Sequence, residues 1–441
     1  MNKDTSNIIV LGKGPIGIYT SYFLLKNGYN VINIDSGVGL KYLRDKIIVD
    51  SNIDWKDKEQ KPSLNYKASD YAWTGACMGL NKKLFSDNKD IRIKLPVTSQ
   101  EIGKSYNAIS DIFNFENFDF QQNIPTNKKI KSLDNNFKFI FAKVTKDLHF
   151  SKIQKYLDED KNYKFIDNSI AKKIYNQNSK HYLQYFDFPS LAENILSFDK
   201  IFLCLGTVEN TRLLLSSRKE LDINENFLGK NLSDHISINF GKIYSNDIDI
   251  LKTDFFYQDD DTNSKVWPRL EDKNSELDSF CYVDSFHSRK MTNIKKLFTS
   301  FNGNANLNLF IELTNRNTNN LSIIDESGIP DLKVSFSVLN DEVLEYKNQI
   351  ERYKNYFKKN YVHVKIKNNL IDDISKWETT NHPSGTTMMS DTSEQGVVDK
   401  YSRLWNHDNI YVYGSSVFPT SSNFHPTFAA LALADFSLNN L

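Results

Sequence analysis

In the N-terminal segment, the pattern of apolar residues changes from that of a strand to that of a helix, and then back to that of a strand. Residues 7–11, "NIIVL", are apolar almost throughout, which is typical of a buried strand. A glycine-rich turn follows, and the apolar stretch after it favours a helix. That helix is expected to begin near Pro15, a favoured first-turn residue, and to end at Gly28. A second apolar strand then ends at Asp35, so the pattern predicts a strand–turn–helix–strand unit.

The middle of the chain carries a second unit of this kind and a clear helix start. Residues 199–217 predict a buried strand that runs to Gly206, then a turn, then a helix from about Glu209. Thr98 and Glu101 form a capping-box pattern ahead of another helix.

The C-terminal half mixes strand and helix patterns. The stretches "ANLNLFIEL" and "DLKVSFSVL" favour strands, and "DEVLEYKNQIERYKNYFKKN" favours a long helix. Near the end, "NIYVYGSSVFPTS" is typical of a strand that breaks into a Gly-Ser-Ser turn. The last apolar segment predicts a helix from Pro426, with His425 at its N-cap.

These patterns predict an α/β protein whose domains are discontinuous in sequence. No linker rich in Pro, Gly or Ser divides the chain, and no internal repeat occurs. We expect a nucleotide-binding domain, a partly helical lid or connecting region, and an inserted substrate-binding domain with an antiparallel sheet. Their expected ranges are 1–95, 185–241 and 376–441 for the first domain, 96–184 for the lid, and 242–375 for the inserted domain.

Composition removes several classes of function. Lys+Arg and Asp+Glu both number 55, so there is no overall basic excess for a nucleic-acid partner. Three cysteines without paired spacing predict neither a disulfide framework nor a zinc site. Asp234 and His235 are adjacent, but no second ligand pair has suitable spacing, so no metal is expected. With no secretory signal and no run of eighteen apolar residues, a cytoplasmic protein without a membrane segment is expected.

The N-terminal turn has the chemistry of a dinucleotide site. Gly12, Gly14 and Gly17 form G-x-G-x-x-G, in which the glycines permit a tight turn, close approach of a pyrophosphate and helix–strand packing. The helix N-terminus would face the phosphates. Asp35 follows at the distance from which a carboxylate can bind ribose hydroxyls. The motif alone does not separate FAD from NAD.

Two His-Pro pairs near the C-terminus suggest an active site. His382 lies in "NHPSGTTMMS", and His425 precedes the last helix, whose N-terminal end stabilises negative charge nearby. Each histidine taken alone is more often a cap or a packed ring. The small-residue loop "YAWTGACMGLN" (71–81) could allow close approach of a flat ligand, or could be a buried loop.

Several ordered motifs together resemble the glucose-methanol-choline (GMC) family of FAD-dependent oxidoreductases. The matching stretches are "IIVLGKGPIG" with Asp35, "LGTVENTRLLLSS", "LGKNLSDH", "NRNTNNLSIIDESGIPDLKVSF", and the C-terminal "HPSGTTMMS…GVVD…NIYVYGSSVFPTS…HPTFAALALAD". The resemblance implies a Rossmann-like FAD-binding domain of the GMC/p-hydroxybenzoate-hydroxylase-like two-domain fold, with an inserted α+β substrate domain. Its catalytic histidine falls on His382 and its second active-site position on His425.

The resemblance also implies the cofactor contacts and the reaction. The implied FAD-binding residues are Gly12, Gly14, Pro15, Ile16, Gly17, Asp35, Ser36, Thr74, Gly75, Cys77, Gly206, Gly414, Ser415, His425, Pro426 and Thr427. The implied reaction is hydride transfer from an alcohol carbon to flavin N5, with His382 as general base and His425 hydrogen-bonded to the substrate oxygen. Oxygen, a quinone or a carrier protein would accept the electrons.

The sequence departs from the family in several ways: the chain is shorter than most members, so a trimmed substrate domain is expected, and His425 stands where the bacterial branch often has Asn. The loop 71–81 has Thr74 at the first glycine of the family's G-G-x-S-x-x-N and contains no histidine, so the FAD is expected to be non-covalent. Gly414 stands where many members have Asp; a Gly-Ser-Ser turn resembles bacterial members that act on sugars and polyols. A sugar-like hydroxyl is therefore the first expectation, and an aliphatic or sterol-like alcohol the second. An inactive flavin-binding relative and an ordinary NAD-dependent dehydrogenase remain as alternatives.

Overall fold

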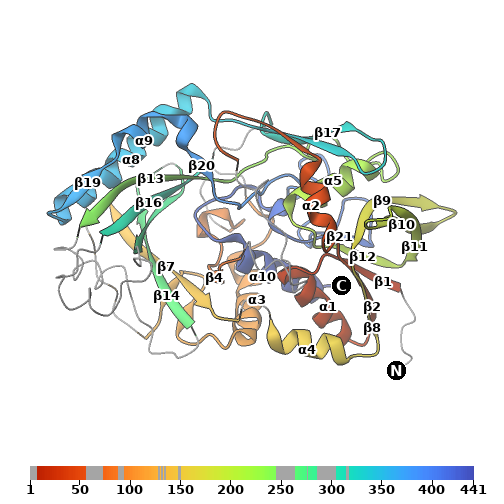
Figure 1. Ribbon diagram of the computed structural model, residues 1–441. Coiled ribbons are helices and arrows are strands. Elements are labelled where there is room, and N and C mark those ends of the chain that lie inside the picture. The colour runs from red at the N-terminus through yellow and green to blue at the C-terminus, as the bar shows by residue number, and fades with distance from the viewer. Residues whose placement is uncertain are drawn as a thin grey trace, which may run out of the picture.

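In the computed structural model, two large sheets of different type lie side by side (Figure 1). The structure describes residues 7–55, 73–87, 94–127, 130, 133, 136–147, 150–244, 264–275, 277–285, 304–313 and 317–441. Parts of the loop 71–81 and of the region 242–375 lie outside these residues.

The first sheet is parallel and consists, in the described residues, of five strands in the order β21-β12-β1-β2-β8. The strands are β1 (Asn7–Leu11), β2 (Asn30–Ile34), β8 (Tyr163–Ile166), β12 (Lys200–Leu203) and β21 (Ile410–Val412). Helix α1 (Pro15–Lys26) connects β1 to β2, as the pattern predicts. The sheet therefore joins segments from both ends and from the middle of the chain.

The second sheet is antiparallel, with strands in the order β19-β13-β16-β15-β14-β7-β4, and with β20 also paired to β13. Its strands are β4 (Ala76–Cys77), β7 (Phe137–Thr145), β13 (His235–Tyr244), β14 (Ser264–Asp272), β15 (Ser279–Ser285), β16 (Asn304–Glu312), β19 (Val364–Ile366) and β20 (Glu378–Thr379). The predicted strand in "ANLNLFIEL" is confirmed as β16.

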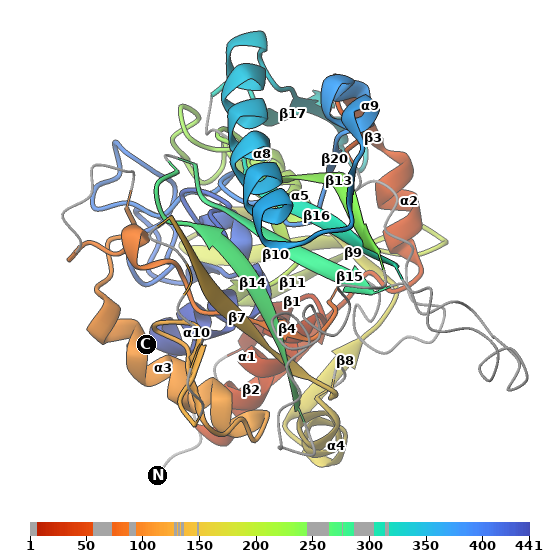
Figure 2. The same ribbon diagram turned by 90° about the vertical axis from the view of Figure 1, so that its left-hand side faces the viewer.

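Helix α8 (Asn340–Asn360) covers one side of the antiparallel sheet, together with α9 (Asn368–Asp372), as Figures 1 and 2 show. Its buried side chains recur at helical spacing, as in Tyr346, Tyr353 and Phe357. Tyr353 packs its ring 5.2 Å from that of Phe137 and donates its hydroxyl to the Leu270 carbonyl at 3.2 Å. The long helix predicted from the sequence is thus confirmed and is attached to the sheet by aromatic packing.

Smaller elements surround the two sheets. Where the structure describes the chain, three short sheets contain β9 (Ser169–Gln177), β10 (Lys180–Asp187) and β11 (Ala192–Phe198); β3 (Ile47–Ser51), β17 (Asn320–Asp325) and β18 (Asp331–Phe336); and β5 (Phe118–Asp119) with β6 (Ile124–Pro125). The remaining helices among the described residues are α2 (Gly39–Asp45), α3 (Ser99–Ile112), α4 (Ser151–Glu159), α5 (Thr207–Ser217) and the 3₁₀ turns η2 (Lys82–Leu84), η4 (Ile374–Lys376) and η5 (Ser415–Val417). The capping box at Thr98 and Glu101 is present in α3.

Helix α10 (Pro426–Leu438) lies in the middle of the molecule, between α1 and α3 (Figure 1). From Phe428 to Leu438 all its residues are buried, as expected for a helix that is apolar all round. Tyr19 of α1 donates its hydroxyl to the buried carboxylate of Asp435 at 2.5 Å. The last helix therefore connects α1, which follows a strand of the parallel sheet, to β4 of the antiparallel sheet.

One predicted boundary was wrong by a few residues. The strand expected to reach Gly206 ends at Leu203, and the helix expected from about Glu209 begins at Thr207. The cause is the Leu205 amide, which donates to the side-chain oxygen of Asn210 at 3.0 Å instead of to a neighbouring strand. The chain thus turns earlier than its apolar run indicates.

Candidate active site

The glycine turn between β1 and α1 is packed too closely for side chains. Gly12 has φ +96°, and a Cβ there would lie 2.4 Å from the carbonyl oxygen of Cys204. A Cβ at Gly17 would lie 2.0 Å from the Gly12 carbonyl oxygen. Gly14 is the N-cap of α1, followed by Pro15. The turn therefore has the tight geometry expected of a pyrophosphate cradle.

The N-terminal end of α1 and the end of β2 form one surface. Residues 13–16 keep some exposure, whereas Gly12 and Gly17 are buried. Asp35 directly follows β2, and its carboxylate accepts the Lys13 amide at 2.7 Å and the Gly37 amide at 2.8 Å. Burial raises the pKa of this carboxyl, and the two amide bonds oppose that shift. Asp35 and its partly exposed neighbour Ser36 are thus placed where a ribose could approach.

Three loops meet beyond the carboxyl ends of β12 and β21. Thr207 and Ser415 both donate their hydroxyls to the Pro383 carbonyl, at 2.6 and 2.8 Å. Gly206, the N-cap of α5, is exposed and has φ +80°, and a Cβ added to it would meet no atom of the described residues within 4 Å. Gly414 has φ +136° and is buried beside them. The predicted residues 206, 414 and 415 are therefore brought together next to His382.

The loop at 73–77 leads into β4, which contacts α10. Thr74 is exposed and Gly75 has φ +79°. Cys77 is fully buried, and its thiol donates to the Gly75 carbonyl at 3.4 Å. Burial raises the pKa of this thiol well above its ordinary value, so it is a packed side chain and not a thiolate.

His382 and His425 face each other at the entrance of α10. Their ring centroids are 5.4 Å apart, and the ring planes are perpendicular at 89°. Phe280 and Phe310 lie beside them, with centroids 5.8 Å from His425 and 6.5 Å from His382. Both histidines keep partial exposure although most of their neighbours are buried. The two predicted catalytic residues are thus adjacent, on an aromatic wall.

His425 is not held by the helix that it precedes. It is the N-cap of α10 but makes no side-chain capping bond, and its buried Nε2 has no hydrogen-bond partner among the described residues. Pro426 and Thr427 follow as the first helical residues, both partly exposed. Because buried polar atoms in proteins are almost always hydrogen-bonded, this nitrogen fits a position that a bound group completes.

The structure adds a third histidine that the sequence analysis did not include in the site. The chain from β20 to Ser384 runs antiparallel to the start of β13, so His235 lies beside His382. The two Nδ1 atoms are 3.1 Å apart, and the ring centroids 5.2 Å. The adjacent residue Asp234, whose metal role the sequence already argued against, accepts the His382 amide at 3.2 Å and the Thr380 hydroxyl at 2.9 Å.

Burial favours the neutral form of all three histidines. It lowers the pKa of His235 to about 4, partly offset by hydrogen bonds to backbone of 421–422 and by the Asp278 charge. It lowers the pKa of His382 well below its ordinary value, with a further contribution from His235. The pKa of His425 is also well below its ordinary value, first through burial and then through the Arg269 guanidinium. Neutral imidazoles are available as bases over the physiological pH range.

Buried acids of the antiparallel sheet hold the loop that leads into α10. Asp278 accepts the Ser422 hydroxyl at 2.6 Å and the Asn81 amide at 2.9 Å. Glu271 accepts the Asn423 amide at 2.9 Å, and burial raises the pKa of its carboxyl. No sequence motif predicts these contacts, because the partners are more than 140 residues apart in the chain. They fix the residues immediately before His425.

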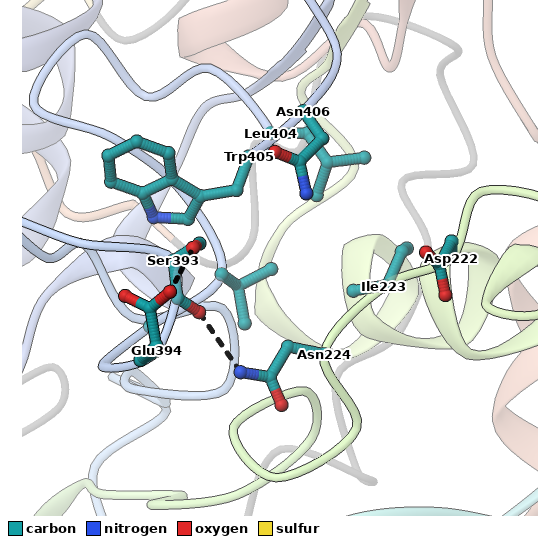
Figure 3. A pocket seen from close by; sticks show the side chains of 10 residues that line it. Asp222, Ile223, Asn224, Ser393, Glu394, Leu404, Trp405 and Asn406 are labelled. Carbon is teal, nitrogen blue, oxygen red and sulfur yellow. Dashed lines mark hydrogen bonds between the residues drawn. The ribbon is translucent and has the colours of Figure 1, made fainter.

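A separate cavity of about 260 Å³ lies away from the histidines, between the chain after α5 and the loop 393–406. Figure 3 shows Trp405, Ser393 and Glu394 on one side and Asp222, Ile223 and Asn224 on the other. Asn224 donates its amide across it to the Ser393 carbonyl at 3.0 Å. It contains none of the residues that the sequence assigns to the site.

Two further properties concern only the described part of the chain. No group of three or more His, Cys, Asp or Glu side chains there could hold a metal ion. No helix there is both long enough and apolar enough to cross a membrane.

Comparisons with known proteins identify a family domain and the fold. Residues 333–434 match the family model "GMC oxidoreductase". The structure of pyridoxine 4-oxidase from Mesorbium loti is similar with a TM-score of 0.60 at 14% identity, over 99% of each chain. The structure of formate oxidase is similar with a TM-score of 0.58 at 12% identity, over 99% of this chain and 98% of that one. No curated protein matches the chain in sequence.

The structural matches extend over the whole chain and give the fold, a mixed α/β architecture with a parallel sheet at a nucleotide-type turn and a second, antiparallel sheet. The family match covers the segment that contains both His382 and His425. Members of this family are generally flavoproteins that oxidise CH–OH groups. Residues 333–434 therefore carry the GMC oxidoreductase domain, and the chain as a whole shares its fold with these two solved structures.

Proposed function

We propose that this protein oxidises an alcohol to a carbonyl compound with a non-covalently bound FAD, and that His382 is the general base. The observation that carries the proposal is the pair of perpendicular histidine rings, 5.4 Å apart, in which His425 Nε2 has no partner in the described part of the chain. Such a pair can contact one hydroxyl group from two sides, which is the arrangement that deprotonation of an alcohol needs.

The residues at the carboxyl edge of the parallel sheet fit an FAD. The turn at Gly12, Gly14 and Gly17 would hold the pyrophosphate at the α1 N-terminus, and Asp35 the ribose. The exposed Gly206 and the start of α10 would lie along the rest of the cofactor. The flavin supplies the hydride acceptor, while the protein supplies position and electrostatics. Because the described residues 73–77 contain no histidine, a histidyl–flavin bond there is not expected.

The two histidines would have different tasks. His382 takes the hydroxyl proton as a neutral base, and its lowered pKa keeps it unprotonated at neutral pH. His425, at the positive end of α10, would hydrogen-bond the substrate oxygen through its Nε2, for which the described residues supply no partner. Residues 1–95, 185–241 and 376–441 would form the cofactor domain, and 242–375 the substrate domain, with 96–184 as the connecting region.

For the substrate, a hydroxyl of a sugar or polyol remains our first proposal, on the basis of the Gly-Ser-Ser turn at 414–416. A small aromatic alcohol is a second candidate, because Phe280 and Phe310 flank the histidines. A similar structure is that of pyridoxine 4-oxidase, whose name gives pyridoxine as the compound that it oxidises. The wall of two phenyl rings would stack equally on an aromatic ring or on the apolar face of a sugar.

Anaerobic mixing tests the proposal. The purified yellow protein is mixed with sugars, polyols, aromatic alcohols and aliphatic alcohols, and loss of the visible flavin band is followed. Wild type and the exposed-histidine control His363→Ala should both bleach with one substrate class, and His382→Ala should not. Bound flavin that no alcohol reduces would favour an inactive relative. Tight binding of NAD without flavin would favour an ordinary dehydrogenase.

A further inference from the structure

We infer that His235 is a positioning residue that fixes the tautomer of His382, with the proton on His382 Nδ1 and the lone pair on Nε2. The inference rests on the proposed function, in which His382 is the base. It follows from the direction of each hydrogen bond in a short chain of groups that begins at a backbone carbonyl.

The first step fixes His235. Its Nε2 is 2.7 Å from the carbonyl oxygen of Ser422, and a carbonyl oxygen only accepts. His235 Nε2 therefore carries a proton. Since burial keeps this imidazole neutral, its other nitrogen, Nδ1, has a lone pair and must accept. The ring is also held by Phe310, on which it stacks at 5.8 Å and 18°.

The second step fixes Thr380. Its hydroxyl donates to the Asp234 carboxylate at 2.9 Å, so the hydroxyl proton is already used. The Thr380 oxygen can then only accept from a histidine nitrogen. It lies 3.1 Å from His382 Nδ1 and 3.2 Å from His235 Nδ1.

The third step follows for His382. Its Nδ1 has two neighbours, His235 Nδ1 and Thr380 Oγ1, each at 3.1 Å, and both are acceptors. An unprotonated Nδ1 would place three lone pairs against one another in a buried site, which is costly. His382 therefore carries its proton on Nδ1, and Nε2 is left as the basic nitrogen.

This arrangement suits a base that must release its proton again. The substrate hydroxyl proton would move to His382 Nε2, while the Nδ1 proton stays in its bond to His235 and Thr380. The group that orients His382 is a neutral imidazole and not a carboxylate, so it selects the tautomer without strongly stabilising the imidazolium. Asp234 acts indirectly: its carboxylate accepts the Thr380 hydroxyl and the His382 backbone amide, and so helps to hold both residues in place.

Two substitutions distinguish the role of Nδ1 of His235 from that of Nε2. In His235→Asn the side-chain oxygen replaces Nδ1 as acceptor, whereas in His235→Gln the amide reaches the Nε2 position and keeps the bond to Ser422. We expect His235→Gln to slow anaerobic flavin reduction by at least about 10-fold, since a wrong tautomer removes the base. His235→Asn should recover most of that loss. Equal losses in both, at equal flavin content, would overturn the inference.

Nitrogen NMR reads the tautomer directly and does not depend on turnover. In protein labelled with ¹⁵N-histidine, the His382 signals are assigned with His382→Asn, and the shifts show which nitrogen carries the proton. We expect protonated Nδ1 in wild type and a mixture of tautomers in His235→Gln. Protonated Nε2 in wild type would overturn the inference. If instead His382→Ala reduces flavin at the wild-type rate, the proposed function fails while the NMR result still stands.

Discussion

The glycine turn before α1 and the histidine cluster before α10 are built in opposite ways. The turn is local: Gly12 and Gly17 are close in the chain and pack against each other, and backbone atoms set its shape. The cluster is assembled from distant segments, with His235 and His382 separated by 147 positions and joined by side-chain hydrogen bonds. Substitution in the turn should therefore remove cofactor binding as a whole, whereas substitution in the cluster should remove chemistry and leave the cofactor bound.

The largest effect is expected from Gly17→Ala. The added Cβ would lie 2.0 Å from the Gly12 carbonyl, a contact that backbone movement must relieve, so flavin content should fall to near zero. Flavin released from purified protein measures it. The control is Gly28→Asn, at φ +85° with no neighbour within 4 Å, which should keep its flavin because Asn tolerates this conformation. Full flavin in Gly17→Ala would contradict the cradle.

The next largest effect is expected from His382→Ala. Loss of a general base should lower the rate of flavin reduction by about 10²–10⁴-fold while flavin content stays at the wild-type level. Stopped-flow reduction by the best substrate measures it. Loss of flavin in this variant would contradict the expectation that the histidine cluster affects the chemistry and leaves the cofactor bound.

The pH dependence of flavin reduction is a further test of His382 as the base. Because burial lowers the pKa of His382, the base stays neutral well below pH 6.5. The rate of flavin reduction by a non-ionising alcohol should therefore be flat between about pH 6 and 8 and should fall only at lower pH. A fall centred near pH 6.5 would indicate an exposed base elsewhere.

A smaller effect is expected in acid stability. The folded pKa of His235 is about 4 against 6.5 in the unfolded chain, so between these values the unfolded chain binds more protons. Stability from this group is therefore present above pH 6.5 and is lost as the pH falls towards 4, by about 3 kcal/mol in total. Urea unfolding should show a shallower acid loss in His235→Asn than in wild type. Parallel curves would contradict the burial of a neutral imidazole.

The smallest effect is expected from Thr98→Ala, which removes the capping box of α3. Stability should fall by about 1 kcal/mol, and flavin content and reduction rate should not change, because Thr98 touches neither region. Thermal unfolding with Thr98→Ser as the matched control measures it. A change in rate would show that stability alone can mimic an effect on the site.

The sequence predicted best what short segments determine. The β1–α1–β2 unit, the capping box at Thr98 and the start of α10 at Pro426 follow from residues close in the chain, and all three are present. The facing of His382 and His425 followed only from resemblance. His235 was missed because nothing in its own neighbourhood encodes a partner 147 positions away.

The boundary between the strand and the helix in the second unit could also not be predicted from the apolar pattern. The apolar run before Gly206 favours a longer strand than the one that forms. A single side chain, Asn210, takes the Leu205 amide and turns the chain early. The hydrophobic pattern does not show that a side chain can accept a backbone N–H that would otherwise bond to a neighbouring strand.

The order of strands in the parallel sheet has a consequence for how the chain folds. Strand β1, made first, pairs with β12 about 190 positions later, and β12 with β21 about 200 positions after that. Until those partners are synthesised, β1 and β2 present an apolar edge to other chains. We expect refolding from denaturant to be slow, limited by this long-range closure, and more prone to aggregation when the segment containing β21 is removed. The topology that assembles the site from distant pieces thus also sets the period during which the unfinished protein is vulnerable.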